Sequence, residues 1–406
     1  MFALSVCGIM GLMNVLLVTE SYWPNADGGA LFERRLVHGL IGRGHKVTVW
    51  APAPRFASYD EQDGPSLIHR ERGVTLWANT KYKVSLFPFL KARQIILRER
   101  PEVIHIHNCY WMGLTTIFWA RRMRIPVIAT NHFMPENLTL NLKLPDLLNR
   151  PLERLTWSFL VWFHNRAQYV TSPTPTAVKL LVDHGLKVPS EAITNGIDTS
   201  VFRPGQDANG VVARYGVATD RPVVLYVGRL DGEKRLDILI SAMGQIKQAG
   251  VAAQLVLVGY GKAMDSLKAQ AKRLKIADDV IFTGFIDEAD KPLIYNTATV
   301  FAISSPAELQ SIVTLEAMAT GLPLVAVDVA ALKELCHDGE NGYLFPKDDF
   351  NVMAQKLMNI LENKALQKRF GAKSISIVQS SHSTNHMFEA YETAYKHTII
   401  EAGKTL

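Results

Sequence analysis

Short apolar runs alternate with longer segments of helical spacing along most of the chain. In the first half, the runs have the length of strands, and the segments between them repeat apolar residues every three or four positions, as a helix with one buried face does. A polar loop with three prolines interrupts the series at 51–66. This alternation predicts an α/β fold with a parallel sheet and right-handed crossovers. The predicted strands lie at 14–19, 46–50, 67–77 (two short strands), 103–107, 126–130, 168–171 and 192–194, and the helices at 30–43, 113–123 and from Pro151.

The same alternation begins again in the second half. A tight turn, NGID at 195–198, and a polar stretch at 206–210 separate the two series, which is typical of a linker between domains. A chain of 406 residues is also long for one core. We therefore predict one domain at 14–205 and a second that starts at 206. The second-half strands are expected at 222–227, 254–258, 280–282, 299–303 and 324–327, and the helices at 234–248, 262–274, the end of 304–321 and from 350 onward, with a turn at 341–342.

Residues 1–13 form an apolar extension before the first strand. The extension has no basic start and is too short to span a bilayer, so it is not read as an anchor. We expect the fold to begin near Asn14, and Met10 or Met13 is an alternative start of the natural chain.

The segment 304–321 has the features of an anion-binding site. A predicted strand leads into a loop, and a helix then runs from about Ile312 to Gly321. A helix N-terminus at the carboxyl end of a parallel strand favours an anion such as a diphosphate, because its backbone N–H groups are free. Glu308 and Glu316 bracket this position, and carboxylates suit the hydroxyls of a sugar and a ribose. The segment predicts a nucleotide-sugar site, with a purely structural helix start as the alternative.

Arg229 and Lys234 lie five positions apart where another predicted strand ends. The fork of an arginine and the point charge of a lysine would together contact one diphosphate there. An exposed basic pair without a ligand is the alternative. Two cations at the leaving group make a catalytic Mg²⁺ unnecessary, and the chain has no Asp-x-Asp motif of metal-dependent transferases. We therefore expect no metal and no cofactor beyond the nucleotide sugar itself.

Positive charge is concentrated in the first half. The chain carries +6, but residues 1–205 hold 23 Lys and Arg against 15 Asp and Glu, a net +8, and the remainder holds 21 against 23. No motif for nucleic-acid recognition accompanies this charge, so we expect no nucleic-acid partner. An anionic membrane surface or an acidic acceptor is the preferred interpretation.

The stretch 70–100 combines basic and aromatic residues. Its eight basic residues face only Glu71 and Glu99, and Trp77, Tyr82, Phe87 and Phe89 lie among them. A solvated helix face with its aromatics in the core and an interfacial patch are both compatible with this pattern. The aromatics of the helix from Pro151 onward are more typical of a core, and we assign them no ligand.

Five motifs occur in the order that is found in glycosyltransferase family 4, and through them residues 14–400 resemble that family. The motifs are NGID at 195–198, VGRLDGEK at 227–234, VLVGYG at 256–261, FTGF at 282–285, and the Glu308 and Glu316 pair followed by AMATG. The resemblance implies the GT-B fold, in which two Rossmann-like parallel-sheet domains face a cleft. It further implies that 14–205 binds the acceptor, that 206–384 binds the donor, and that a C-terminal helix at 385–406 packs back on the N-terminal domain.

The resemblance also implies roles for individual residues. Arg229 and Lys234 match the cations that neutralise the leaving nucleoside diphosphate, and fixed positive charge there is the largest catalytic lever. Glu308 matches the residue near the donor sugar's reacting face, where we assign it positioning and electrostatics rather than covalent attack. Glu316 matches the carboxylate on the ribose, and His132 the histidine near the sugar's O6.

A further set of residues is implied in donor binding. Gly28 and Gly29 match the loop that closes over the donor phosphates. This chain departs from many members in having Ser311 in place of a glycine, and Ala330 and Ala331 in place of two glycines, which leaves the sugar's identity open. The remaining predicted donor contacts are Gly228, Gly259, Gly284, Phe285, Ile312 and Val313.

These observations predict a retaining, metal-independent hexosyltransferase that uses a nucleoside diphosphate sugar of the UDP-glucose or GDP-mannose type. The basic first half and the loop FMPENLTLNLKLP after His132 favour a lipid acceptor such as diacylglycerol at a membrane surface. A soluble sugar or polysaccharide acceptor, a nucleotide-sugar epimerase and a non-catalytic donor-binding protein are the alternatives. Three separated cysteines (Cys7, Cys109 and Cys336) indicate a reducing cytosol, and hence a cytoplasmic protein peripheral on the membrane. The donor base, the sugar and the oligomeric state stay open.

Overall fold

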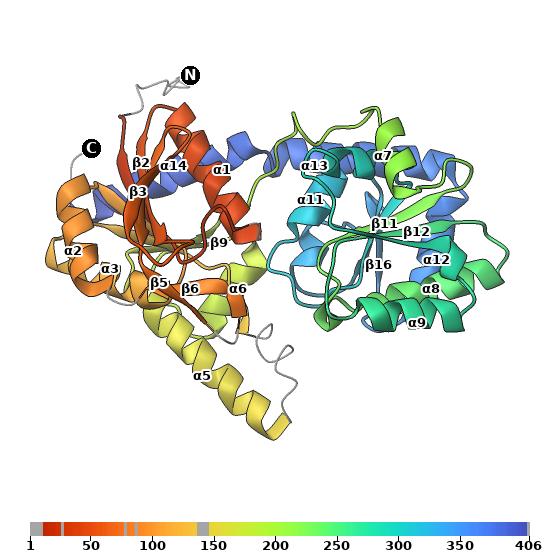
Figure 1. Cartoon of the computed structure of the whole chain (residues 1–406), viewed down its shortest axis with the longest axis horizontal. Helices are drawn as coiled ribbons and strands as arrows, with labels where there is room; N and C mark the ends of the chain where they lie inside the picture. The colour runs from red at the N-terminus through yellow and green to blue at the C-terminus, as the bar shows by residue number, and fades with distance from the viewer. Residues whose placement is uncertain (1–10, 26–27, 77–78, 86–87, 136–145, 404–406) are drawn as a thin grey trace, which may run out of the picture.

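The computed structural model describes residues 11–25, 28–76, 79–85, 88–135 and 146–403, and it contains two large, mainly parallel sheets. The first has the strand order β10-β9-β8-β7-β1-β2-β4-β3, and the second β13-β12-β11-β14-β15-β16. Each sheet lies in its own domain, and the domains stand next to one another (Figure 1). The α/β fold with two parallel-sheet domains that the sequence predicts is therefore observed.

Central strands of the first sheet are buried on both faces, as their unbroken apolar runs predict. Neighbouring strands pair in parallel except β3, which is antiparallel to β4. A separate hairpin is formed by β5 (Gly73–Leu76) and β6 (Asn79–Ser85). The sheet consists of β1 (Asn14–Val18), β2 (Lys46–Pro52), β3 (Tyr59–Asp63), β4 (Ser66–Glu71), β7 (Val103–Ile106), β8 (Val127–Thr130), β9 (Tyr169–Ser172) and β10 (Ser190–Ala192).

Helices cover both faces of this sheet and divide its core into two clusters. On one face α1 (Gly28–Gly42) packs with the C-terminal helix of the chain. On the other, α2 (Pro88–Glu99), α3 (Trp111–Arg122) and α5 (Asp146–His164) contribute the buried side chains. The short helix α6 (Pro175–Asp183) follows β9, and Thr174 caps it by accepting a hydrogen bond from the N–H of Ala177.

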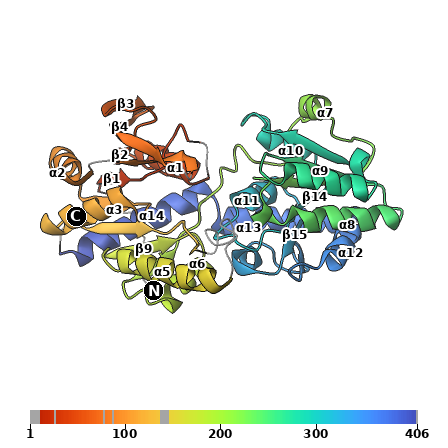
Figure 2. The ribbon, with the colours of Figure 1, turned by 60° about the horizontal axis from the view of Figure 1, so that its bottom comes forward.

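The second sheet is entirely parallel, and a single large core cluster surrounds it. The side of the second domain that carries α11 faces the first domain (Figures 1 and 2). The strands are β11 (Val223–Val227), β12 (Gln254–Val258), β13 (Val280–Gly284), β14 (Val300–Ile303), β15 (Leu324–Val327) and β16 (Gly342–Phe345). The helices are α7 (Asn209–Tyr215), α8 (Leu236–Gln248), α9 (Met264–Arg273), α10 (Lys291–Asn296), α11 (Ile312–Ala319), α12 (Phe350–Leu361) and α13 (Lys364–Ser381).

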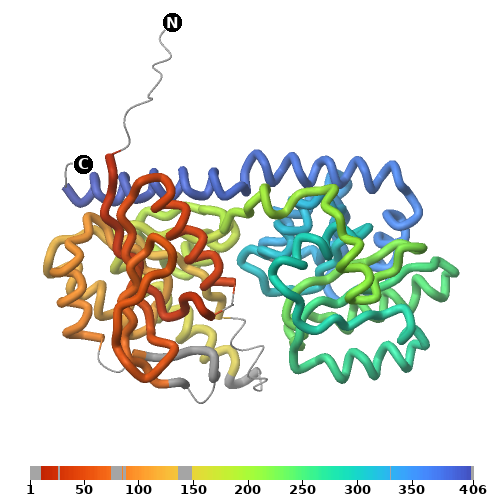
Figure 3. The backbone as a smooth tube through the Cα atoms, turned by 45° about the horizontal axis from the view of Figure 1, so that its top comes forward, coloured from red at the N-terminus to blue at the C-terminus, as the bar shows by residue number. Residues whose placement is uncertain are grey.

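The last helix, α14 (Thr384–Glu401), leaves the second domain and runs along the first (Figure 3). Its buried residues Met387, Tyr391 and Tyr395 belong to the core of the first domain. Glu392 on the same helix accepts hydrogen bonds from Arg43 at 2.7 Å and His45 at 3.0 Å. The crossing of the C-terminal helix that the family resemblance implies is therefore observed, while the domain boundaries at 205/206 and 384/385 stay predictions.

Several predicted elements were wrong in their limits. The loop predicted at 51–66 contains the edge strand β3, because its polar sequence YDEQD has no apolar period and pairs only with β4. The helix predicted from Pro151 begins at Asp146, and Pro151 lies inside it. Gly342, predicted in a turn, starts β16, whose four residues are too few for a clear pattern. Met13, which we assigned to the extension, is buried in the first core at 2% exposure.

In the stretch 70–100, some residues serve the fold and others are exposed as an interfacial patch would be. Arg70 is buried and pairs with Glu61 at 2.7 Å, so it serves the fold. Phe89 and Leu90 on α2 are 43% and 68% exposed, as an interfacial patch requires. Trp77 and Phe87 lie outside the described residues, as do residues 1–10 and most of the loop after His132. In the described part of the chain, we find no helix with the length and hydropathy of a membrane span.

Candidate active site

Both sheets have a topological switch point, where successive strands depart to opposite sides of a central strand. In the second sheet this point lies between β11 and β14, and in the first between β1 and β7. Ligands of open parallel sheets bind beyond the carboxyl ends of the strands at such points. Arg229 follows β11 and Ser304 follows β14, while Thr19 and His107 follow β1 and β7. The residues predicted to carry chemistry therefore lie at the edges where the topology favours a site.

Glycines let the loops after β11, β12 and β13 come together. The N–H of Gly228 donates to the carbonyl of Val258 at 2.9 Å, and that of Gly259 to the carbonyl of Gly284 at 2.9 Å. Gly259 has a φ of 126°, and a Cβ there would lie 2.0 Å from the carbonyl oxygen of Gly228. No side chain is tolerated at this contact. The glycines thus allow these three loops to pack against one another, while their predicted contacts with the donor stay predictions.

Lys234 and Glu308 form an ion pair in this site, with Nζ 2.7 Å from Oε1. Lys234 comes from the 3₁₀ turn η1 (Gly232–Lys234) and Glu308 from the loop between β14 and α11. Both are largely shielded, at 15% and 17% side-chain exposure. The hydroxyl of Ser304 donates to the backbone carbonyl of Lys234 at 2.9 Å, which ties η1 to the end of β14. The sequence assigned both residues to the predicted site but did not predict that they pair.

Arg229 is held by two carboxylates of its own loop. It donates to Asp231 at 2.8 Å and makes a very short contact with Glu233, and its side chain is 58% exposed. Oε1 of Glu233 also lies 3.8 Å from Nζ of Lys234, so both predicted cations converge on one buried carboxylate. Glu233 was missed from the sequence, although its place in VGRLDGEK between the two cations was a usable signal.

Ser311 caps α11 and turns its hydroxyl toward the helix. Its Oγ accepts from the N–H of Thr314 at 3.3 Å and from the hydroxyl of Thr314 at 2.8 Å. The N–H groups of Ile312 and Val313 find no acceptor in the part of the chain that the structure describes. These are the free donors that a helix N-terminus offers to an anion. The cap therefore fixes the helix start and leaves two donors for a ligand.

Glu316 lies one turn further along α11 and is buried at 2% exposure. It accepts from Lys291 at 2.8 Å and from the hydroxyl of Tyr295 at 2.7 Å. The same hydroxyl also lies 3.1 Å from the carbonyl oxygen of Val313. Burial, together with the charge of Glu316, raises the pKa of Tyr295 well above its usual range, so this phenol stays a hydrogen-bond donor. Lys291 and Tyr295 were missed because α10 is only six residues long.

Two exposed aromatic rings stand beside the loop after β13. Phe285 is 80% exposed and Tyr260 is 58% exposed. Their rings stack at 6.1 Å with an interplanar angle of 25°. Gly284, with a φ of 71°, turns the chain immediately before Phe285. A stacking surface of this kind suits a flat heterocycle. The donor contacts assigned to Gly284 and Phe285 stay predictions.

The first domain meets α11 through the start of α1. A Cβ on Gly28 would lie 3.6 Å from Cδ1 of Ile312, so the predicted phosphate loop reaches the N-terminus of α11. Gly29 follows it in the first turn of α1. Arg35, farther along the same helix, donates to the carbonyl of Gly196 at 2.6 Å. Burial lowers the pKa of Arg35, and the nearby charge of Glu316 partly offsets this effect.

Gln310 connects the loop before α11 to the first domain. Its Oε1 accepts from the N–H of Asn195 at 2.7 Å, and its Nε2 donates to the carbonyl of Pro173 at 3.2 Å. The hydroxyl of Thr174 donates to the carbonyl of Leu309 at 2.9 Å. Because Gln310 lies one residue before the Ser311 cap, these bonds join the first domain to the segment that leads into α11.

His132 belongs to a group of aromatic side chains in the first domain. Its ring stacks on that of His107 at 5.5 Å and lies 4.9 Å from that of Phe32. Burial, with the neighbouring imidazoles of His105 and His132, holds the pKa of His107 well below its usual range, so His107 is neutral. His132, which follows β8, therefore contacts the first domain's switch point through His107, whereas Lys234, Glu308 and Glu316 belong to the second domain.

Two buried polar atoms near His132 lack a hydrogen-bond partner among the described residues. They are Nε2 of His107 and Nδ2 of Asn131. Both residues follow strands of the first sheet, β7 and β8, at its carboxyl edge. Unpaired buried polar groups are costly, so hydroxyl groups of a bound sugar or acceptor are suitable partners. The sequence signal was VIHIH, where polar residues alternate in an otherwise apolar strand.

Glu20, just after β1, is a buried carboxyl that was also missed. Its Oε1 accepts from the N–H of Met112 at the start of α3 at 2.7 Å. Burial raises the pKa of Glu20 to about 8, against the opposing effect of this hydrogen bond. Glu20 is therefore protonated at neutral pH.

This shift predicts that the folded state loses stability as pH rises from about 4.5 to about 8. A raised pKa means that the folded state holds the proton longer than the unfolded state, and deprotonation then leaves a charge in the interior. Glu20→Gln keeps the acceptor and is neutral at every pH. We expect the free energy of unfolding of the wild type to fall, relative to Glu20→Gln, by on the order of 4 kcal/mol between pH 5 and pH 9.

Urea unfolding at several pH values measures this difference. Glu102→Gln is the matched control, because Glu102 is exposed and accepts a backbone N–H, that of Asn14, at the same 2.7 Å. A parallel pH dependence of the wild type and Glu20→Gln would contradict the expectation.

Two family models match the chain, and together they cover most of both domains. Residues 26–201 match the model described as Glycosyltransferase Family 4, and residues 212–376 match Glycosyl transferases group 1. Residues 202–211, between the two sheets, lie between the two matches.

Characterised relatives align over most of their length. The chain is 33% identical to phosphatidyl-myo-inositol mannosyltransferase of Mycobacterium tuberculosis over 374 residues, which cover 88% of this chain and 91% of that protein. It is 28% identical to alpha-monoglucosyldiacylglycerol synthase of Streptococcus pneumoniae over 340 residues, 82% of this chain and 75% of the relative.

Solved structures share the whole fold. Sucrose-phosphate synthase from Thermosynechococcus elongatus aligns with a TM-score of 0.76 at 22% identity, covering 96% of this chain and all of the other. Anabaena HepE in complex with UDP aligns with a TM-score of 0.73 at 20% identity, covering 95% of this chain and all of that protein. At these identities the likeness shows the fold alone, whereas the mannosyltransferase shows the family. The chain therefore belongs to glycosyltransferase family 4, has the GT-B fold and is a glycosyltransferase.

Proposed function

We propose that the chain is a retaining, metal-independent hexosyltransferase that moves a hexose from a nucleoside diphosphate sugar to a lipid acceptor such as diacylglycerol. The observation that carries the donor class is the Lys234 and Glu308 pair, 2.7 Å apart, beside the free N-terminus of α11. A cation, free N–H donors and a sugar-facing carboxylate meet there, which is the chemistry that a hexosyl diphosphate requires.

In this proposal each group acts on the part of the donor that it matches in charge. Lys234 and Arg229 stabilise the diphosphate as the bond to the sugar breaks and negative charge develops on it. The ammonium of Lys234 has three donors, so it can keep Glu308 and still contact a phosphate. Glu308 faces the sugar, Glu316 accepts from the ribose hydroxyls, and Tyr260 and Phe285 flank the base. His132, with His107, faces the sugar from the first domain.

Several observations support a lipid acceptor on a membrane surface. One relative is named for a glucosyldiacylglycerol product and another for a phosphatidylinositol acceptor. The first half of the chain carries a net +8. Phe89 and Leu90 are exposed on α2, next to the exposed Arg93. We therefore propose peripheral association with the cytoplasmic face of a membrane, where a basic surface with apolar side chains is attracted to anionic lipid.

The test is a matrix of donors and acceptors with product analysis by mass spectrometry and NMR. UDP-glucose, UDP-galactose, GDP-mannose and ADP-glucose are each incubated with diacylglycerol vesicles, with soluble oligosaccharides, or alone, and each reaction is run once with Mg²⁺ and once with EDTA. We expect an α-linked hexosyl lipid with one donor and no dependence on metal. Transfer only to a soluble sugar, conversion of the donor alone, or loss of activity in EDTA would each overturn the corresponding part of the proposal.

A further inference from the structure

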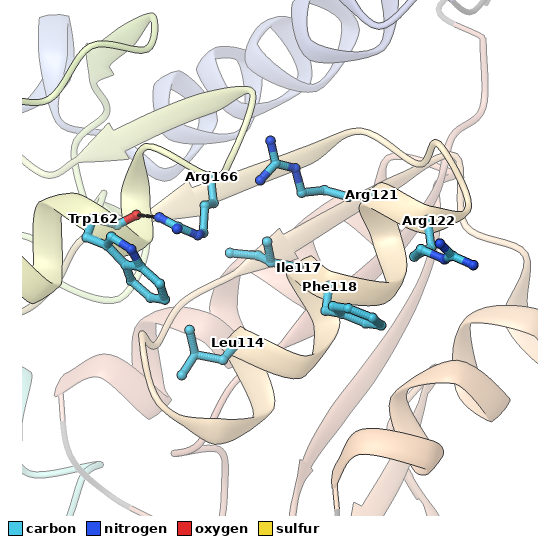
Figure 4. A pocket seen from close by; sticks show the side chains of 7 residues that line it. All are labelled: Leu114, Ile117, Phe118, Arg121, Arg122, Trp162 and Arg166. Carbon is cyan, nitrogen blue, oxygen red and sulfur yellow. Dashed lines mark hydrogen bonds between the residues drawn. The ribbon is translucent and has the colours of Figure 1, made fainter.

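The helices α3 and α5 enclose a groove on the first domain, away from the candidate active site. Its volume is about 410 Å³. Figure 4 shows Leu114 and Phe118 of α3 on one side and Trp162 of α5 on the other. In Figures 1 and 2, α3 lies at the edge of the first domain that is farthest from the second domain. The groove is therefore separate from the donor site.

The rim of the groove exposes large apolar side chains. Phe118 is 47% exposed and Trp162 is 46% exposed. On α5, Leu155 and Phe159 are exposed too, and with Trp162 they repeat at intervals of four and three residues, which places them on one helix face. A helix on a globular domain ordinarily turns such a face inward. Here the inward positions are filled by other residues, such as Trp157 and Phe163, so this apolar stripe is additional to the core.

Positive charge accompanies the apolar surface. Arg121, Arg122 and Arg166 line the groove, and no carboxylate lines it. Within the described residues none of the three forms an ion pair. The guanidinium carbon of Arg166 lies 3.5 Å from the ring centre of Trp162, and its Nη1 donates to the carbonyl of Trp162 at 2.5 Å. Arg166 is thereby held at the groove, with donors still available for an anion.

We propose that this groove binds an anionic phospholipid of the membrane. Arginine guanidiniums match the oxygens of a phosphodiester, and the aromatic and aliphatic side chains match the glycerol backbone and the first methylenes of an acyl chain. A surface that is both apolar and basic, with aromatic residues at its rim, is what the bilayer interface selects. The proposal deepens the membrane association suggested above, on which it rests for the choice of partner, by naming the surface that makes the contact.

Flotation of the full chain with vesicles tests the proposal. The vesicles contain equal parts of phosphatidylglycerol and phosphatidylcholine, or phosphatidylcholine alone, at low salt and without any nucleotide sugar. We expect wild-type protein to bind the anionic vesicles and the triple variant Arg121→Gln/Arg122→Gln/Arg166→Gln to bind them on the order of 100-fold more weakly, since each basic residue near the surface contributes several-fold. Phe118→Gln/Trp162→Gln, which keeps the charge, should bind on the order of tenfold more weakly.

A matched control separates the groove from net charge. Lys268→Gln/Lys272→Gln/Arg273→Gln removes three exposed cations from α9 in the second domain. We expect this variant to float like the wild type. Equal loss in the control and groove variants, unchanged flotation of the groove variants, or a wild type that ignores anionic vesicles would overturn the proposal.

A transfer assay distinguishes failure here from failure of the proposed function. With acceptor dispersed in neutral detergent, the triple arginine variant should transfer hexose at the wild-type rate, because the groove lies away from the reacting groups. Loss of transfer under these conditions would overturn a pure docking role. If the wild type does not float with anionic vesicles but still transfers hexose to lipid, the groove proposal is wrong and the proposed lipid acceptor stands.

Discussion

The Lys234→Ala variant is expected to lose hexosyl transfer by a factor on the order of 10² to 10³, because it removes a fixed positive charge from the departing diphosphate. The contact seen in the structure adds a second effect. Glu308, which Lys234 holds at 2.7 Å, is left without its counter-charge next to the diphosphate. The carboxylate then repels the leaving group instead of being neutralised, so we expect binding of nucleoside diphosphate to weaken as well.

Steady-state transfer and thermal shift with UDP and GDP measure the two effects in the same protein. Lys247→Ala is the matched control, because it breaks a lysine–carboxylate pair of equal length, with Asp279 at 2.7 Å, in the same domain but on its surface. We expect the control to keep both activity and nucleotide stabilisation. Circular dichroism should show that Lys234→Ala stays folded. Near-normal turnover in that folded variant would show that Lys234 has no role in catalysis.

If Glu316 binds the ribose as proposed, the Glu316→Gln variant is expected to lower kcat/KM for the donor by on the order of 10- to 100-fold, through loss of charge-assisted hydrogen bonds. Glutamine keeps the shape and still accepts from Tyr295, so the fold should survive. It also leaves the ammonium of Lys291 without its partner at 2.8 Å. Tyr295→Phe keeps the carboxylate and removes one hydrogen bond that orients it, so a smaller loss of about fivefold is expected.

The informative result is whether Glu316→Gln lowers kcat/KM more than Tyr295→Phe does. Glu340→Gln serves as the control, because it breaks a lysine–glutamate pair, with Lys373 at 3.0 Å, on the exposed side of the second domain. We expect no change in donor kinetics from it. If Tyr295→Phe lowered kcat/KM as much as Glu316→Gln, the carboxylate would be a structural anchor for α10 rather than a ribose contact.

The architecture was predictable because its strands are buried on both faces. Runs such as VVLYV in β11 and QLVLV in β12 have no polar interruption, and this signal does not depend on distant residues. The edge strand β3 and the short β16 lack it, since an edge strand is half solvated and four residues show no period. The start of α5 was predicted too late, because proline is typical of a helix's first position, whereas Pro151 lies within this helix.

Candidate site residues could be proposed from the sequence only in the segments that follow a strand end. Arg229, Lys234, Glu308 and Glu316 were proposed in this way, from the segments that follow β11 and β14, and their roles stay predictions. The partner of Glu316 was not proposed, because Lys291 contacts it from another helix. The contact of Gln310 with Asn195 was not predicted either, because the two residues lie in different domains. Such pairings depend on side-chain direction in three dimensions, which spacing alone does not contain.

The position of α14 has a consequence for how the chain folds. The core of the first domain contains Met387, Tyr391 and Tyr395, and the aromatic ring of Phe388 fills the space beside Gly39, where a Cβ would lie only 2.0 Å from it. During synthesis, the first sheet is therefore complete long before the helix that covers one of its faces emerges. Contacts that join the two ends of the chain form late, and apolar surface stays open until then. We therefore expect the isolated first domain, residues 14–205, to be less stable than the same residues supplied with 384–401.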